Sequence, residues 1–595
     1  MTEYNAPLKD MNFLLNDMGL LKELSEMPAT AEATPDLVSA ILDEGAKLAK
    51  DFVGACNIKG DEEGALLNDG HVKLPAGFKE AYDAYKEGAW HSLTFPEEHG
   101  GQGLPNTVGN AIHEMLESAN MAWSLCPLLS QGAIKAIMTH GSQELIDTYV
   151  PKMISGEWTG TMNLTEASAG SDLSQVRTKA TPNGDHYLIS GQKIFITYGD
   201  HDQADNIVHL VLARLPDAPE GTRGISLFLV PKFTLNEDGT PGERNDAWPI
   251  KVEHKLGIHG SPTCVMSYGE NGGAVGYLIG NENEGLKCMF TMMNDARLAV
   301  GTQGLSIAEM AYQRAVAYAK DRKQGRSELD GSKNTAIINH ADIRRTLMTM
   351  RAYIEAMRAL NFRTMVDLDI AENHSDPEWT EWADRRIGLI TPVVKAWFTD
   401  LGVEIASMGV QIHGGMGFIE ETGAAQYYRD ARILPIYEGT NGIQAADLVG
   451  RKIIHDGGSA VREYLDEADS LINHLNGIEG EDMSAMRAHL AAGIDTLDRA
   501  VDWLMSNSNN TTAVGASSTY ILKIFGLVAG GIGLARSMDV ALSKINSGEG
   551  DQEFYKAKVF TARFYAENLL SQAPSILSAV REGHNTIRSI PDEMF

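Results

Sequence analysis

The chain has 595 residues, of which 43% are hydrophobic and 22% are charged, as in ordinary globular proteins of several domains. Its 50 basic and 80 acidic residues give a formal net charge of −30 with no run of lysine and arginine, which argues against nucleic acid and anionic membranes as partners. The four cysteines form no C-x-x-C pair, so the sequence predicts no metal site and free thiols, as in a cytoplasmic protein.

The spacing of apolar residues predicts five segments. Residues 1–34 form an N-terminal segment, and residues 35–162 repeat apolar positions with the period of an α-helix. Residues 163–283 alternate with a period of two and are rich in glycine and proline, which predicts a compact β domain. Residues 284–451 return to long helical repeats that suit an antiparallel bundle, and residues 452–595 predict a separate helical module.

Several single elements follow from the same patterns. Asn183 and Gly184 precede an alternating run, 186–197, which predicts a β-hairpin. Two helices are expected near the C-terminus, at about 517–544 and 554–582. The N-terminal stretch lacks the basic start and apolar core of a signal peptide, and the nearest candidate for a membrane span, 524–535, is too short. A cytoplasmic location is therefore expected.

The stretch GGIGLAR, Gly530–Arg536, imitates a dinucleotide-binding fingerprint. No predicted strand precedes it and no βαβ unit surrounds it, so the fingerprint interpretation fails. Small residues that let two helices approach closely explain the pattern better.

Glu438 ends the apolar run of ILPIYEGTNGIQ and is followed at once by Gly439. A buried carboxylate is unfavourable unless it is paired, protonated or used in chemistry. The alternative is a surface glutamate at a helix start, where acidic side chains suit the helix dipole. This stretch alone favours the surface glutamate.

Three further stretches combine small residues, hydroxyls and rings. Thr165–Ala180 could expose backbone amides and hydroxyls to a pyrophosphate or a flavin edge, or form an ordinary Ser-rich turn. Phe195 and Thr197 could stack on and hydrogen-bond a flat heterocycle, although strand alternation alone gives the same pattern. Gly414 and Gly415 either let the backbone approach a ligand closely or form a helix C-cap.

Five stretches, taken in chain order, resemble the motifs of the acyl-CoA dehydrogenase family. They are PEE-x-GG at Pro96–Gly101, LTE-x-x-x-GSD at Leu164–Asp172, the strand motif Ile196–Thr197, Q-x-x-GG-x-G-F at Gln411–Phe418, and YEGT at Tyr437–Thr440. The resemblance implies an α+β fold with an N-terminal helical domain, a middle β domain and a C-terminal four-helix bundle. This chain adds an extra C-terminal helical domain.

The reaction that the resemblance implies is the FAD-dependent α,β-dehydrogenation of an acyl-CoA thioester. Glu438 would be the base that removes the α proton, with apolar neighbours that raise its basicity and a helix N-terminus that acts in the opposite direction. Some relatives carry the base near Asn294, but the matching residue here is Ala296, which cannot act. The adjacent Asp295 is a minor alternative.

The resemblance also implies the binding residues. FAD would be bound by Leu164, Thr165, Gly170, Ser171, Phe195, Thr197, Arg322, Gln411, Gly414, Gly415 and Thr440. The substrate would contact Ser171, Asp295, Arg297, Tyr437 and Gly439. Arg322, Gln411, Gly414 and Gly415 would come from the neighbouring subunit, so a homodimer is expected, with an electron-transferring flavoprotein as electron acceptor. Smaller relatives use one surface to bind a second dimer, and the extra helical domain would cover that surface here.

Alternatives stay open within the family. The ends of the chain and the stretch 253–266 are similar to a branch that includes enzymes of sulfur-compound breakdown, which is the expected role, and enzymes for straight-chain acyl-CoA. An acyl-CoA oxidase would use the same fold and base but pass electrons to oxygen. A DNA-associated flavoprotein of the alkylation response would need a basic face, which the net charge of −30 argues against.

Overall fold

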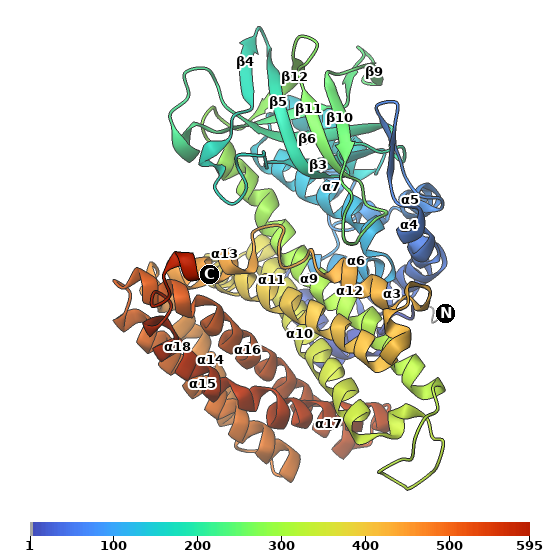
Figure 1. Ribbon diagram of the computed structural model, residues 1–595, viewed down its shortest axis with the longest axis vertical. Coiled ribbons are helices and arrows are strands. Elements are labelled where there is room, and N and C mark those ends of the chain that lie inside the picture. The colour runs from blue at the N-terminus through green and yellow to red at the C-terminus, as the bar shows by residue number, and fades with distance from the viewer. Residues whose placement is uncertain (1–3) are drawn as a thin grey trace.

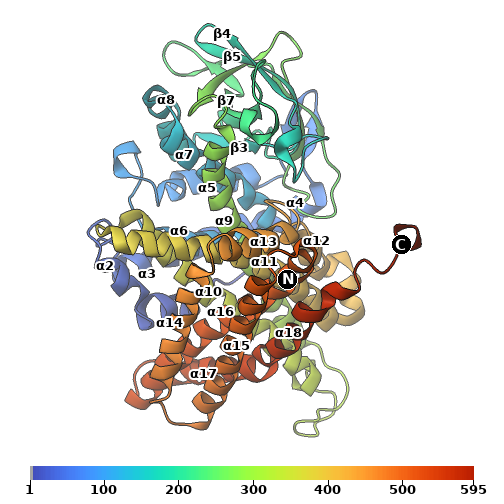
Figure 2. The ribbon, with the colours of Figure 1, turned by 90° about the vertical axis from the view of Figure 1, so that its left-hand side faces the viewer.

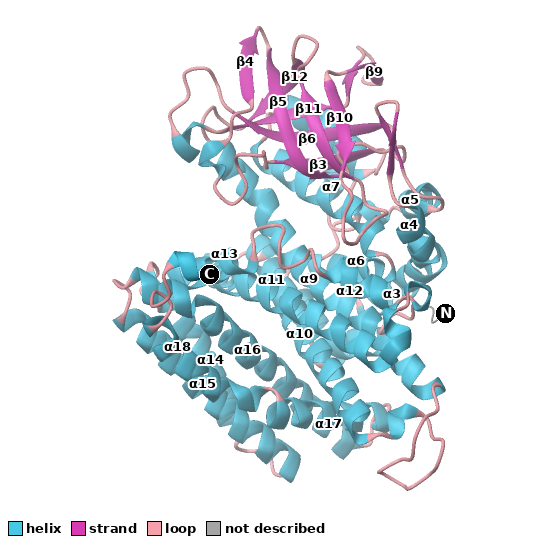
Figure 3. Cartoon of the chain, viewed as in Figure 1, coloured by secondary structure: helices cyan, strands magenta, loops and turns pink. Residues whose placement is uncertain are grey.

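The protein consists of a β domain that lies at one end of a larger body of helices (Figure 1). The computed structural model describes residues 4–595, so the first three residues of the predicted N-terminal segment lie outside the described part. Figure 3 separates the helices from the strands by colour. The architecture is α+β, as the sequence predicts.

Short helices form the N-terminal part. They are α1 (Leu8–Asn12), α2 (Leu20–Ser25), α3 (Pro35–Leu48), α4 (Asn57–Glu63), α5 (Phe78–Glu87), α6 (Asn106–Ala119), α7 (Met121–His140) and α8 (Gln143–Ile154). Polar caps set where some of them begin: the side chain of Asn120 accepts a hydrogen bond from the Trp123 amide at 3.1 Å. A hairpin of β1 (Leu66–Asn68) and β2 (His71–Lys73) interrupts the helices, which the helical period did not predict.

The middle of the chain forms an eight-stranded sheet in the order β10-β11-β5-β12-β7-β6-β3, with β4 paired to β5. Its strands are β3 (Trp158–Asn163), β4 (Lys179–Asn183), β5 (His186–Thr197), β6 (Asn206–Ala213), β7 (Ser226–Pro231), β10 (Ala247–Val252), β11 (Thr263–Tyr268) and β12 (Ala274–Ile279), and β8 (Phe233–Leu235) pairs separately with β9 (Pro241–Arg244). β3 is parallel to β6. β4 and β5 form the predicted hairpin, in which Asn183 pairs with His186. The sheet starts at Trp158, ahead of the expected boundary at residue 163.

Three long helices pass through the helical body: α9 (Gly285–Asp321), α10 (Ala341–Asn373) and α11 (Pro377–His413). α9 runs from the β domain into this body (Figures 1 and 2). Met289 and Met292 in its first turns belong to the same buried apolar cluster as Ile134 of α7 and Leu210 and Leu227 of the sheet. The sheet and the helices therefore share an apolar contact along α9. Two short helices follow α11, α12 (Ala424–Ala431) and α13 (Asn441–Asp447).

The extra C-terminal helices are α14 (Ser459–Leu475), α15 (Glu481–Ser506), α16 (Thr511–Ser547), α17 (Gln552–Asn568) and α18 (Ala573–Glu582). The single helix expected at 554–582 is two helices, because Pro574 lies in the first turn of α18, the helical position that suits proline best. The four cysteines of the chain are free and buried.

Glycines of α16 allow it to pack closely on the bundle. A Cβ atom on Gly526 would lie 2.4 Å from Trp397 of α11. A Cβ atom on Gly530 would lie 2.8 Å from Trp397 and 3.1 Å from Ala356 of α10. The GGIGLAR stretch is therefore a helix-packing surface, as predicted.

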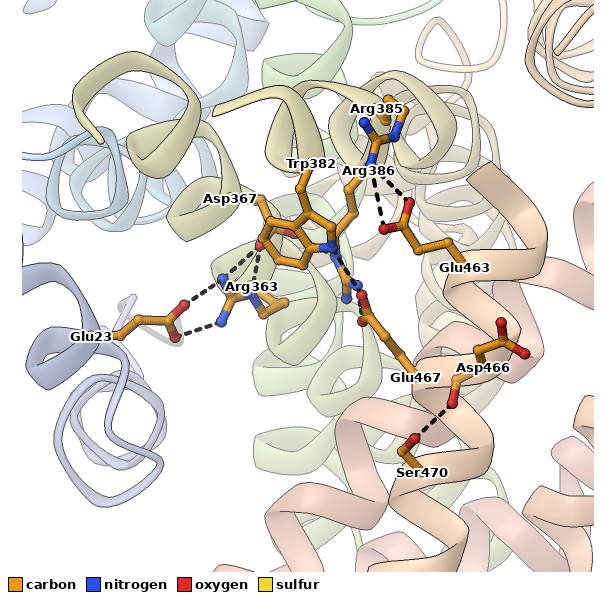
Figure 4. A network of polar contacts seen from close by, with 10 residues as sticks. All are labelled: Glu23, Arg363, Asp367, Trp382, Arg385, Arg386, Glu463, Asp466, Glu467 and Ser470. Carbon is orange, nitrogen blue, oxygen red and sulfur yellow. Dashed lines mark hydrogen bonds and ion pairs between the residues drawn. The ribbon is translucent and has the colours of Figure 1, made fainter. Parts of the chain in front are cut away.

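A network of charged residues joins three parts of the chain (Figure 4). Arg363 of α10 pairs with Glu23 of α2 and with Asp367, both at 2.6 Å. Arg386 of α11 pairs with Asp367 at 2.9 Å and with Glu467 of α14. The N-terminal segment and the extra helices are thus tied to the same two central helices.

α16 is long and apolar enough to cross a membrane, by length and composition alone, with a mean hydropathy of 1.5 over its most apolar window. The sequence predicts no membrane span, because its nearest candidate, 524–535, is too short. In the structure 78% of that window is buried inside the protein, as in the core helix of a globular domain.

Candidate active site

Glu438 lies in the loop between α12 and α13 and has a left-handed backbone, with φ +56°. This conformation costs a residue other than glycine about 1–3 kcal/mol, so the surrounding structure must enforce it. The Asn441 amide donates to the carbonyl of Pro435 at 3.0 Å, and the Gln444 side-chain amide donates to the carbonyl of Glu438 at 3.2 Å. Gly439 also has a positive φ, +86°, so the turn predicted after the glutamate is present.

The side chain of Glu438 is half-buried and lies near two cations. Burial raises the pKa of Glu438 to about 7, although the guanidinium of Arg297 and the ammonium of Lys395 act to lower it. Burial therefore outweighs the nearby positive charges. A carboxyl group with a pKa near neutrality is suited to accept a proton from a weak carbon acid.

Asp295 and Arg297, two residues apart on α9, have different partners. Asp295 pairs with Lys135 of α7 at 2.7 Å. Arg297 is largely buried and donates to the side-chain oxygen of Asn294 at 3.3 Å. Among the described residues its buried Nε has no hydrogen-bond partner. The ion pair with Lys135 engages the carboxylate of Asp295, whereas Arg297 lies within electrostatic range of Glu438.

A buried polar chain begins at Tyr437, which the sequence predicts as a substrate contact. The hydroxyl of Tyr437 donates to the side-chain oxygen of Gln303 on α9. One turn further along α9, Ser306 donates to Glu117 of α6 at 3.2 Å. Burial raises the pKa of Glu117 well above its usual range. Sequence reasoning missed Glu117 and Gln303, because these contacts join segments far apart in the chain.

The predicted flavin stretch on the β domain is held by an internal ion pair. Lys193 of β5 is fully buried and pairs with Glu166 at 2.8 Å. Glu166 also accepts hydrogen bonds from the backbone amides of Arg177 and Thr178, at 2.7 and 3.0 Å. The loop that contains Leu164, Thr165, Gly170 and Ser171 is thus fixed beside strand β5, and the Ile194 amide donates to Thr165 at 2.9 Å.

Phe195 does not follow regular strand alternation. Its φ is +62°, and the register between β5 and β11 shifts around it. The ring is 61% exposed, which is unusual for phenylalanine. Thr197 lies two residues further on and pairs with Thr263. The bulge turns an aromatic ring outward beside the fixed loop.

The second predicted flavin set lies at another place on the chain. Arg322 directly follows α9. Gln411 lies in the last turn of α11, and Gly414 and Gly415 follow that helix; all four residues are exposed. The ring of Tyr318 stacks on that of His413 at 4.4 Å, so the two helix ends are adjacent. Gln411 lies about 24 Å along α11 from Lys395, at 1.5 Å per residue. One chain therefore cannot bring this set to Glu438.

The residues near β5 fit a flat aromatic cofactor with a phosphate tail. An outward ring at Phe195 offers a stacking face, and Gly170 leaves open space, since a Cβ atom there would meet nothing within 4 Å. The same openness is found at Gly414 and Gly415. Thr440 caps α13, accepting from the Ile443 amide at 3.3 Å.

A hollow of about 450 Å³ lies between α10, α11, α13, α16 and α17. It is lined by Asn441 but by none of the residues predicted to bind flavin or substrate. This hollow is therefore not the predicted binding site for flavin or substrate.

Four family descriptions match successive parts of the chain. They are "Acyl-CoA dehydrogenase, N-terminal domain" at residues 68–157, "Acyl-CoA dehydrogenase, middle domain" at 161–269, "Acyl-CoA dehydrogenase, C-terminal domain" at 283–453 and "Acetyl-CoA dehydrogenase C-terminal like" at 460–591. The chain belongs to the acyl-CoA dehydrogenase family, whose members are FAD-dependent oxidoreductases.

Individual relatives resemble almost the whole chain. The 3-methylmercaptopropionyl-CoA dehydrogenase of Ruegeria pomeroyi is 45% identical over 97% of this chain and 98% of its own length. A butyryl-CoA dehydrogenase of Syntrophomonas wolfei is 34% identical over 94% of each chain. Among solved structures, an acyl-CoA dehydrogenase of Bacillus anthracis complexed with FAD has a TM-score of 0.75 at 20% identity, over 96% of this chain and 91% of its own. ACDH-11 of Caenorhabditis elegans in complex with C11-CoA has a TM-score of 0.74 at 20% identity, over 99% of this chain and 97% of its own.

Proposed function

We propose that this protein oxidises 3-methylmercaptopropionyl-CoA to 3-methylthioacryloyl-CoA in the breakdown of dimethylsulfoniopropionate, with Glu438 as the base. The environment of Glu438 supports its role as the base. Its backbone is strained, and its half-buried carboxyl group has a pKa of about 7 and lies near two cations. The observation that supports the substrate is the 45% identity to the Ruegeria pomeroyi enzyme along nearly the full chain.

The residues of this chain divide the work of the reaction. The carboxylate of Glu438 takes the α proton of the thioester, because its raised basicity matches a proton that is only weakly acidic. Bound FAD supplies the acceptor for the hydride that leaves the β carbon. The guanidinium of Arg297 acts electrostatically on Glu438, and Tyr437, anchored through Gln303, is the neighbour of the base in the chain. Gly439 turns the chain directly after the base, and a main-chain amide of this turn would stabilise the charge that develops on the thioester carbonyl.

FAD would be held in two parts. Leu164, Thr165, Gly170, Ser171, Phe195, Thr197 and Thr440 would contact the flavin side, and a second copy would contribute Arg322, Gln411, Gly414 and Gly415. The separation of about 24 Å along α11 supports the second copy, as do the exposed Met416 and Phe418 beside these glycines. The enzyme would therefore act as a cytoplasmic homodimer that passes its electrons to an electron-transferring flavoprotein.

A straight-chain acyl-CoA dehydrogenase is the second candidate, because a 34% identical relative is a butyryl-CoA dehydrogenase. Anaerobic mixing with 3-methylmercaptopropionyl-CoA and with butyryl-, hexanoyl- and octanoyl-CoA, followed by flavin bleaching, separates the two. We expect the sulfur-containing thioester to react fastest. A straight-chain substrate that reacts ~10-fold faster, about 1.4 kcal/mol of discrimination, would assign the second function. Stoichiometric hydrogen peroxide in air, without another acceptor, would indicate an oxidase.

A further inference from the structure

Lys395 is a fully buried lysine near the middle of α11. Its ammonium donates to the carbonyl of Leu434 at 3.0 Å and to the side-chain oxygen of Asn441 at 2.9 Å. Both acceptors are neutral, and within residues 4–595 no carboxylate forms a direct ion pair with it. A buried cation without a paired anion is costly, so its presence requires an explanation.

The two acceptors flank Glu438 in the sequence. Leu434 comes before the glutamate and Asn441 comes after it, so one ammonium fastens both ends of the loop that carries the base. The loop holds Glu438 in a left-handed conformation that it would leave if its ends were free. Lys395 therefore restrains the loop in which the backbone of Glu438 is strained.

The side-chain amide of Asn441 is oriented by hydrogen bonds that its nitrogen donates. Its side-chain nitrogen donates to the Ala396 carbonyl at 3.1 Å, to the Thr399 hydroxyl at 3.0 Å and to Asp400 at 2.7 Å. The oxygen of the amide must then face Lys395. The end of the catalytic loop is thus fixed on α11 at both the nitrogen and the oxygen of the Asn441 side chain.

The charge of Lys395 also acts on Glu438. Burial lowers the pKa of Lys395 to about 8, while Glu438 and Asp400 raise it and Arg297 lowers it. Lys395 therefore remains mostly protonated at pH 7. The charged groups that face Glu438 are Arg297 from α9 and Lys395 from α11, and both favour its ionised form. Two cations on separate helices oppose the effect of burial.

We propose that Lys395 is a positioning residue for the Glu438 base: its ammonium binds both ends of the loop that carries the carboxylate and supplies a buried positive charge to the surroundings of that loop. This inference rests on the proposed role of Glu438. The two effects are separable, because a substitution can remove the charge of Lys395, keep that charge with a changed shape, or keep Lys395 and remove the Asn441 side chain from the loop.

Four variants of the full-length, flavin-loaded enzyme test the proposal: Lys395→Met, Lys395→Arg, Asn441→Ala and Glu438→Gln. Lys22→Met, which changes an exposed lysine on α2, is the matched control. The readouts are flavin content, thermal unfolding and the pH profile of kcat/KM with butyryl-CoA and an artificial electron acceptor. A purely structural role would change stability without moving the acid limb of the pH profile.

Lys395→Met removes the charge, so we expect its acid limb to move up by about one pH unit and its activity at pH 7 to fall at least ~10-fold. Lys395→Arg keeps the charge but changes the shape of the side chain. Its acid limb should stay near that of the wild type, while the maximal kcat/KM at high pH falls. Asn441→Ala should lower the plateau at least ~10-fold with little movement of the limb. Lys22→Met should match the wild type in all three readouts.

The proposal is wrong if Lys395→Met folds, binds flavin and shows an unmoved acid limb with a plateau within twofold of the wild type. If Lys395→Met does not fold, Asn441→Ala decides, and normal turnover of that variant overturns the proposal. Glu438→Gln distinguishes the two levels of inference. Normal activity of Glu438→Gln would show that Glu438 is not the base. If Glu438→Gln is inactive but Lys395→Met is unaffected, only the proposed role of Lys395 is wrong.

Discussion

The ammonium of Lys193 lies 2.8 Å from the carboxylate of Glu166, and both side chains are buried. This pair joins strand β5, which carries Phe195 and Thr197, to the loop that carries Leu164, Thr165 and Ser171. This buried ion pair therefore helps to hold the two parts of the predicted flavin surface together, beside the backbone hydrogen bond from Ile194 to Thr165. Removing either partner leaves a charge in the interior of the protein.

Lys193→Met should lose bound flavin and stability together. The loss of one partner of a buried pair typically costs about 3–5 kcal/mol, because the remaining charge has no compensation. The ratio of flavin to protein after gel filtration and unfolding by urea measure the two effects. The double variant Lys193→Met with Glu166→Gln removes both charges and should recover most of the stability. A single variant as stable as the wild type would contradict the structural role of the pair.

Glu438→Gln should keep its yellow cofactor and lose at least ~10³ in rate, within the range for general bases. The amide has almost the same shape as the carboxylate but accepts no proton. Rapid anaerobic mixing with substrate measures the chemical step directly. Flavin content and melting temperature equal to the wild type serve as the control for folding.

The wild-type enzyme should show an acid limb near pH 7 in kcat/KM. Burial raises the pKa of Glu438 to about 7, and only the ionised form accepts a proton, so activity rises as the pH rises through this value. A limb near pH 4.5, the range of a solvated glutamate, would show that the carboxyl group is hydrated in the free enzyme.

Glu117→Gln should stabilise the protein more at pH 8 than at pH 5. The folded-state pKa of Glu117 is raised well above its usual range, whereas the unfolded chain ionises near pH 4.3. The folded state therefore binds more protons, and stability falls by up to about 1.4 kcal/mol per pH unit between the two pKa values. Urea unfolding across this range should show the gap between variant and wild type widening with pH. Glu98→Gln, an exposed glutamate, should show no such trend.

Gly530→Ala and Gly515→Ala should have opposite effects, although both lie in helix α16. A Cβ atom on Gly515 would meet nothing within 4 Å, so alanine there should add up to about 1 kcal/mol of helix stability. A Cβ atom on Gly530 would lie 2.7 Å from the Tyr565 hydroxyl and 2.8 Å from Trp397, so alanine there should cost about 1–3 kcal/mol. Thermal unfolding of the two variants side by side measures the difference.

Local patterns were sufficient for much of the fold. The hairpin before β5, the three long helices and the packing glycines of α16 follow from periods and turn residues within short windows. The turn at Gly439 was also predictable, because only a few residues tolerate its backbone. The break before Pro574 was missed, although the proline itself was a usable signal.

The site needed contacts that no short window contains. The positive φ of Phe195 arises from a bulge against β11, and the environment of Glu438 is set by Arg297 and Lys395 from two other helices. One signal was present in the sequence: Lys395 is a single charge in an otherwise apolar stretch of helix, TPVVKAWF. A buried lysine at such a place indicates a polar partner in the interior.

The contact between Gly526 and Trp397 has a consequence for how this enzyme can be shortened. Trp397 lies two residues after Lys395 on α11, and the closely packed glycines of α16 cover its indole. Cutting the chain after residue 451 would expose this indole and a strip of apolar surface directly behind the residues that fasten the Glu438 loop. The C-terminal helices thus shield part of the catalytic framework from water, and an isolated 1–451 fragment would lack that cover.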